Sequence, residues 1–144
     1  MRLLIATTTA LVCLAGTASP TTTLAQQARW LARHGGVTGT CAGCATHRMQ
    51  ALSYALVREQ FRPAGGAAVT HALCIVRHES QGNPGAVNAS SGAAGLSQIE
   101  AQWHPEIRKY NLLDPVDGVA AFWRLTRHGR DFYTSYDRYA GYRC

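Results

Sequence analysis

The chain has 144 residues, which leaves room for one domain and a short additional segment. Hydrophobic residues make up 47% of it, a content that excludes disorder throughout. Lys and Arg outnumber Asp and Glu by 14 to 8, and the net charge of +6 suits an anionic partner. The arginines are scattered and accompany no nucleic-acid-binding motif, so we expect no nucleic-acid partner.

Residues 1–25 have the features of a signal peptide. Arg2 is followed by short apolar runs at 3–6 and 10–15 and then by small residues, and cleavage after Ala18 or Ala25 fits this pattern. The apolar region is too short and too rich in threonine for a stable membrane span. We therefore expect a secreted or cell-envelope protein, with Cys13 removed together with the leader.

Four cysteines remain in the mature chain: Cys41, Cys44, Cys74 and Cys144. An even number of cysteines in an exported protein indicates disulfides, and three pairings are possible. Cys144 is the last residue, so its natural use is to tether the end of the chain. A bridge to Cys74 would close a loop of 69 intervening residues, with a contribution of roughly 4 kcal/mol.

Residues 26–62 form an N-terminal segment that contains a Cys-x-x-Cys motif and one helix. Its first part, 26–40, is compatible with a short helix or with an unstructured linker. At Cys41 and Cys44 a local disulfide is favoured and no metal or cofactor is expected. Zinc lacks a nearby second ligand pair, haem attachment needs His directly after the second Cys, and no βαβ setting for a redox motif is visible. Thr46 can cap a helix that runs from His47 to about Phe61.

The next helix ends at about Glu79. Its apolar side chains recur at i, i+3, i+4 and i+7 and predict a stripe that faces a core: Val69, Ala72, Leu73 and Val76. Glu79 continues this face, and Gly82 and Pro84 end the helix. The negative end of the helix dipole and partly apolar neighbours favour the protonated carboxyl group, so we expect the pKa of Glu79 to be raised. A general acid needs such a pKa near neutral pH.

The remaining elements are less regular. Residues 103–110 predict a short helix with Pro105 inside it, and Trp103 is compatible with a core position or with a sugar-binding cleft. Asp114 is the predicted cap of a last helix that starts at Pro115 and ends at Gly129. The tail, 131–143, is rich in tyrosines, whose faces suit sugar rings: Tyr133, Tyr136, Tyr139 and Tyr142.

Between these helices, small residues at 90–95 would allow a ligand to approach the backbone closely. Gln98 follows in an apolar setting, where its amide must be hydrogen-bonded. Five segments stand in order, which are Glu79-Ser80, Asn83-Pro84, Ala86-Val87-Asn88, Ser91-Gly92-Ala93 and Gly95-Leu96-Ser97-Gln98-Ile99. Together they resemble the signature of soluble lytic transglycosylases of the lysozyme-like superfamily, over about residues 67–140.

No strand-length alternating run stands out, so we expect a mostly α-helical fold with at most a small β-hairpin, stapled by the disulfides. The resemblance implies that residues 63–144 form a lysozyme-like domain. It implies that the enzyme cleaves β-1,4 MurNAc–GlcNAc bonds of peptidoglycan and that Glu79 is its single acid and base. The implied sugar-binding residues are Ser80, Asn88, Ser91, Gly95, Gln98 and either Tyr136 or Tyr139. The tyrosine segment 136–140 departs from the Ala-Tyr-Asn pattern of the family. Glycan strands and anionic wall polymers are the expected partners, and no cofactor is expected.

Three alternatives remain open from the sequence. Glu100 would point the same way as Gln98 if residues 98–100 were extended, and a second acid in the cleft would favour lysozyme-type hydrolysis. A wall-binding module could keep this fold without catalysis, although the presence of Glu79 argues against it. A small redox or metal protein built on Cys41 and Cys44 is the third alternative.

Overall fold

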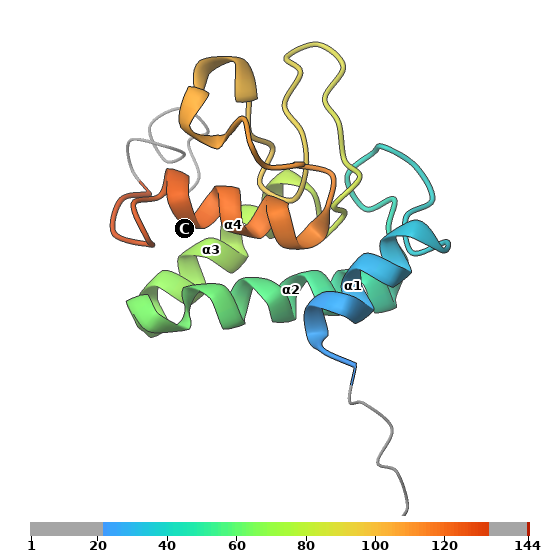
Figure 1. Cartoon of the computed structure of the whole chain (residues 1–144), viewed down its shortest axis with the longest axis horizontal. Helices are drawn as coiled ribbons and strands as arrows, with labels where there is room; N and C mark the ends of the chain where they lie inside the picture. Colours follow the sequence, from blue (N-terminus) through green and yellow to red (C-terminus); the bar gives the residue numbers. More distant parts are fainter. Residues whose placement is uncertain (1–21, 133–143) are drawn as a thin grey trace, which may run out of the picture.

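A computed structural model describes residues 22–132 and 144 and confirms the mostly α-helical, disulfide-stapled fold (Figure 1). The helix α2 packs against both α3 and α4, α1 lies across one end of α2, and the loops after α3 extend away from α2. None of the described helices is long and apolar enough to cross a membrane. The described α-helices are α1 (Leu24–Arg33), α2 (His47–Phe61), α3 (Gly66–Glu79) and α4 (Pro115–Leu125), and the short 3-10 helices are η1 (Arg62–Ala64), η2 (Ala101–Trp103) and η3 (Pro105–Ile107).

The helix α1 occupies the first part of the segment for which the sequence left helix and linker open. Thr23 and Gln26 form a capping box, in which the Thr23 hydroxyl accepts from the Gln26 amide at 3.2 Å. Arg29 then donates to Asp114 at 2.9 Å and to Asp117 at 2.8 Å. The hydrogen bond to Asp114 is the main cause of a raised pKa of Arg29. These contacts dock α1 on the first turn of α4.

The start of α1 bears on where a signal peptide would be cut. Cleavage after Ala25 would remove Thr23 and the first helical residues, and loss of the cap alone costs about 1 kcal/mol. Cleavage after Ala18 leaves the helix whole, so we expect the mature protein to begin at Ser19. Intact-mass measurement of the exported protein checks this expectation. A mature chain that begins at Gln26 would contradict it.

The helix α2 begins and ends where the sequence predicts. The Thr46 hydroxyl accepts from the Met49 amide at 3.3 Å, and Gly65 follows the helix at φ 96°. The ring of Phe61, which is fully buried, lies 4.9 Å from that of Phe122 and 5.1 Å from that of Trp123, centroid to centroid. The buried face of this helix is made of Met49, Ser53, Leu56, Val57 and Phe61.

The helix α3 ends at Glu79, as the sequence predicts, and its most buried face is shifted relative to the predicted stripe. Val69 and Leu73 are only partly buried. The fully or almost fully covered positions are Ala68, Ala72, Ile75 and Val76. Glu79 lies four residues after Ile75 and three after Val76, so it continues the helix face that packs into the core.

Residues 86–99 form isolated bridges, which agrees with the expectation of at most a small hairpin. The bridges join Val87 to Ala94 and Ala94 to Ile99. The helix expected at 103–110 is instead split into η2 and η3. The residue before a proline is disfavoured in the α region, and His104, which precedes Pro105, has φ −127° and ψ 76°.

The helix α4 has the predicted start and an earlier end. The Asp114 carboxylate accepts from the Val116 amide at 2.9 Å, but the helix stops at Leu125 and not at Gly129. The Thr126 hydroxyl donates to the Phe122 carbonyl at 2.9 Å, and the next two residues have positive φ angles of 49° and 62°. The left-handed turn therefore starts before the glycine that the sequence offers as the stop.

Two disulfides join the pairs that the sequence favoured. Cys41 pairs with Cys44 at a Cα–Cα distance of 5.2 Å, and Cys74 pairs with Cys144 at 5.8 Å. The first bridge shapes a local loop. The second attaches the last residue of the chain to α3, which is the helix that carries Glu79.

Candidate active site

Glu79 is the last residue of α3 and is half-buried. The residue before it, His78, is exposed, whereas Ser80 after it is completely buried. The chain then turns sharply, because Gln81 and Gly82 both have positive φ angles. Glu79 is therefore a carboxylate at the boundary between core and solvent, at the negative end of a helix.

The Ser80 hydroxyl joins the end of α3 to the loop that carries the other motif residues. It donates to the Leu96 carbonyl at 2.7 Å and lies 3.2 Å from the Val76 carbonyl. It also accepts from the Gly82 amide at 3.2 Å. Because its side chain is buried and bonded in this way, Ser80 fixes the position of Glu79 relative to the loop, and does so from beneath the surface.

Gln98 has the hydrogen-bonded amide that its apolar surroundings require. Its Nε2 donates to the Ala86 carbonyl at 3.1 Å and to the Gly95 carbonyl at 3.0 Å. Its backbone has φ 49°. In the part of the chain that the structure describes, the Oε1 atom of Gln98 accepts no hydrogen bond, so this oxygen remains available to a ligand.

Gly95 is required by a close approach between two backbone segments. It is buried, with φ 78°, and its amide donates to the Ala86 carbonyl at 2.9 Å. A Cβ atom at this position would come into severe conflict with the carbonyl oxygen of Leu112. Only glycine permits both the left-handed backbone and this contact.

Asn88 and Ser91 shape an exposed turn at the edge of the same loop. The Asn88 Oδ1 atom accepts from the Ser90 amide at 3.0 Å and from the Ser90 hydroxyl at 2.7 Å. The Ser91 hydroxyl accepts from the Ala93 amide at 3.1 Å. The structure thus gives both side chains a role in holding the turn, and it leaves Asn88 exposed.

Glu100 has a different environment from the one that an extended strand would give it. Because the backbone of Gln98 is left-handed, residues 98–100 are not a continuous extended segment. The alternation of an extended strand, which would place the Gln98 and Glu100 side chains on one face, therefore does not apply to them. The Glu100 carboxylate accepts from the Trp103 indole at 3.0 Å and from Gln102 at 3.4 Å. Trp103 is 72% exposed, which excludes the core position for its side chain.

No role was predicted for Asn83, and the structure shows one. This fully buried amide donates to the Gly39 carbonyl at 2.9 Å and to the Cys41 carbonyl at 2.8 Å. The Ser80 carbonyl also accepts from the Gly43 amide at 3.0 Å. The Cys-x-x-Cys loop therefore supports the turn behind Glu79. The Asn83-Pro84 pair marked this position as part of the motif. Its spacing could not reveal that the Asn83 side chain binds a loop about forty residues earlier in the chain.

Two of the predicted sugar-binding residues, Tyr136 and Tyr139, lie outside the described residues. The other predicted site residues come together through hydrogen bonds. Ser80 connects Glu79 to Leu96, and Gln98 connects the same loop to Ala86 and Gly95. The arrangement offers one helix-end carboxylate beside a loop with an available amide oxygen and an exposed, polar turn.

Comparison with protein families gives one match. The family model described as "Transglycosylase SLT domain" matches residues 64–142, which is just over half of the chain. The matched region contains α3, α4 and every predicted catalytic and sugar-binding residue, whereas α1, α2 and the Cys-x-x-Cys loop precede it. No curated protein and no solved structure matches the chain significantly.

Proposed function

Because the chain belongs to the transglycosylase SLT family of the lysozyme-like superfamily, we propose that it is a lytic transglycosylase that cleaves the β-1,4 bond between MurNAc and GlcNAc in peptidoglycan. The observation that carries this proposal is the position of Glu79. It is the last residue of α3, and the Ser80–Leu96 hydrogen bond holds it beside the motif loop.

Glu79 acts twice in the proposed reaction. Its carboxyl proton passes to the glycosidic oxygen as the C1–O bond of MurNAc breaks, which releases GlcNAc with a free hydroxyl group. The C6 hydroxyl of the same MurNAc then attacks C1, and its proton returns to the Glu79 carboxylate. The product is a 1,6-anhydro ring, no water is consumed, and the acid is regenerated.

The surroundings of the other acids support a reaction with one carboxyl group. Two-carboxylate hydrolysis needs a second acid about 5 to 9.5 Å from the first. Each described acid beyond Glu79 has a local partner: Glu100 with Trp103, Glu106 with His104, Asp114 and Asp117 with Arg29, and Asp131 with Arg127. These partners account for the acids without a catalytic role, and Asp137 lies outside the described residues.

Released muropeptides are expected to end in 1,6-anhydro MurNAc. Mass spectrometry of the products from purified sacculi distinguishes this end from a reducing end, because the anhydro product is lighter by one water. Glu100→Gln is expected to leave the product and the rate within a few-fold of wild type, since Glu100 is engaged by Trp103. Reducing ends together with loss of activity in Glu100→Gln would establish lysozyme-type hydrolysis instead.

The loop residues would position the sugar. The Gln98 Oε1 atom can accept a hydrogen bond from a sugar hydroxyl or acetamido N–H, and the backbone from Ser91 to Gly95 can line the cleft. Asn88 would act at the rim of the cleft, through its exposed side chain and the turn that it holds. Ser80 would position Glu79 without touching the sugar. Tyr136 or Tyr139 is proposed to supply an aromatic face.

Trp103 is proposed to stack on a sugar ring at the edge of this cleft. Trp103→Ala is expected to weaken binding to sacculi roughly tenfold, because an aromatic contact of this kind contributes about 1 kcal/mol or somewhat more. Trp30→Ala is the matched control, since Trp30 of α1 is also exposed (54%) but stacks on His34, outside the family match. A co-sedimentation assay measures both, and equal losses would contradict a specific role for Trp103.

Export and wall affinity complete the proposal. An enzyme of this family meets its substrate outside the cytoplasmic membrane, and the predicted leader and the two disulfides are consistent with that location. The net charge of +6 would favour adsorption to anionic wall polymers. This contribution should weaken with added salt, since exposed charges are screened.

A further inference from the structure

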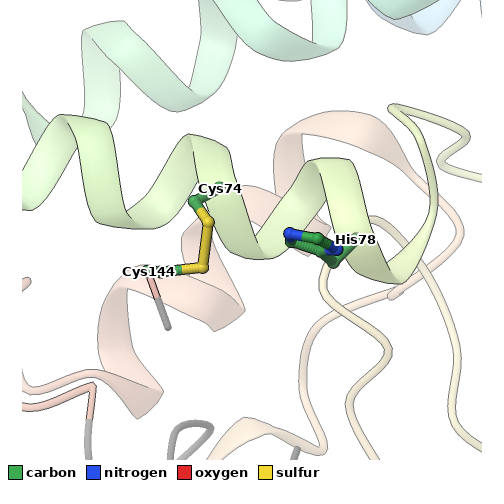
Figure 2. Close-up of side chains that lie close together, drawn as sticks. All are labelled: Cys74, His78 and Cys144. Atoms are coloured by element: carbon green, nitrogen blue, oxygen red, sulfur yellow. A yellow bond between two sulfur atoms is a disulfide. The ribbon is translucent and has the colours of Figure 1, made fainter. Parts of the chain in front are cut away.

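One cluster of metal-binding side chains lies outside the proposed catalytic machinery. Cys74, His78 and Cys144 bring their ligand atoms within 4.8 Å of one another. Cys74 and His78 are four residues apart on α3 and therefore lie on the same side of the helix, as Figure 2 shows. Cys144 reaches this side from the end of the chain, where the two sulfurs form the disulfide.

We propose that the reduced form of this cluster binds one Zn²⁺ through the thiolates of Cys74 and Cys144 and a ring nitrogen of His78. A dithiol reductant would open the bridge by thiol–disulfide exchange. It gives two electrons and two protons to the two sulfurs and becomes a disulfide itself. Zn²⁺ then displaces the two thiol protons into solvent, and no further oxidant or reductant is needed.

The residue types suit this ion. Zinc prefers thiolate and imidazole ligands, at about 2.3 Å and 2.0 to 2.1 Å, and two thiolates on a tetrahedral ion lie about 3.7 Å apart. The three ligand atoms lie within 4.8 Å of one another in the oxidised protein, so on reduction the two sulfurs need to move apart only from bonding distance to the spacing of two zinc-bound thiolates. Two thiolates and a neutral imidazole balance the charge of the ion, which matters because the cysteines are partly buried. A fourth position remains for water.

In the reduced protein, bound zinc would replace the disulfide as the cross-link between Cys144 and α3. Either cross-link ties Cys144 to α3, so the end of the chain stays attached in oxidising and in reducing surroundings. Bound zinc would also keep the two thiolates from pairing with Cys41 or Cys44 before oxidation is complete. This inference does not depend on the proposed enzymatic activity.

Zinc binding can be measured on the full mature chain carrying Cys41→Ser and Cys44→Ser, which removes the other dithiol. We expect native mass spectrometry after reduction to show one zinc per chain and the loss of two protons. We expect competition with a chromophoric chelator to show binding at least tenfold weaker in the added His78→Ala variant. His34→Ala, a change at an exposed histidine that follows the end of α1, should leave the affinity unchanged. The oxidised protein should bind no zinc at this site.

The result that would overturn the proposal is a reduced protein that binds no zinc, or binds it equally well with and without His78. Equal binding by the oxidised protein would overturn it as well. If the double serine variant does not fold, as judged by circular dichroism, the comparison moves to the chain with all its cysteines. Reduced wild type should then hold one zinc more than Cys74→Ser, and equal stoichiometry would refute the site.

Discussion

Glu79→Gln is expected to lower the rate of wall cleavage roughly 10²- to 10⁴-fold, the range that general acid catalysis contributes. The amide keeps the size of the side chain but has no acidic proton to give to the glycosidic oxygen. Because Glu79 is only half-buried, folding should be little affected. Loss of turbidity of purified sacculi measures the rate, and thermal unfolding measures stability.

Glu106→Gln is the matched control for this substitution. Glu106 is an exposed acid of η3 whose carboxylate lies 3.4 Å from the His104 ring, and it lies outside the five motif segments. The Glu106→Gln variant should retain full activity. If Glu79→Gln cleaves sacculi within a few-fold of wild type while Glu106→Gln does the same, Glu79 is not the acid. If the wild type binds sacculi without cleaving them, the chain is a wall-binding module of this family.

Gly95→Ala should produce the largest loss of stability among the glycine substitutions at the site. Its φ of 78° disfavours any side chain, and the added Cβ collides with the Leu112 carbonyl oxygen, which belongs to the backbone and has little freedom to move. Overpacking costs about 1 to 3 kcal/mol, and the left-handed conformation adds about 1 kcal/mol. We therefore expect a loss of about 2 to 4 kcal/mol in urea unfolding.

Gly92→Ala separates these two effects. Gly92 has the same φ of 78°, but no atom lies within 4 Å of its added Cβ. It should lose only the conformational contribution of about 1 kcal/mol. A similar loss for both variants would show that the contact with Leu112 contributes nothing to the requirement for glycine at 95.

The parts of the fold that the sequence predicts best are fixed by local chemistry. Thr46 and Asp114 cap their helices because a side-chain oxygen placed there satisfies free backbone amides, and that pairing spans only two or three residues. The position of Glu79 at the end of α3 follows from helical spacing and the Gly82 stop in the same way. Capping and helical periodicity, which act over a few residues, were therefore enough to predict the position of Glu79 at the end of α3.

The parts that the sequence did not predict depend on a competing side-chain hydrogen bond, on a distant partner and on one unusual backbone conformation. The end of α4 moved to Leu125 because the Thr126 hydroxyl returns to the Phe122 carbonyl, an interaction that competes with the glycine signal. The burial of Ser80 depends on Leu96, sixteen residues away. The left-handed backbone of Gln98 has no marker in its residue type. Periodicity carries no information about such contacts.

The aromatic contact between α2 and α4 determines which part of this chain can be exchanged with a relative in a chimera. Phe61 precedes the region matched by the family, yet its buried ring packs on Phe122 and Trp123 inside that region. A chimera joined at residue 63 would inherit an aromatic cluster without its central ring. It would also lack the loop that Asn83 binds. Recombination among relatives should therefore exchange the region matched by the family together with α2 and the Cys-x-x-Cys loop.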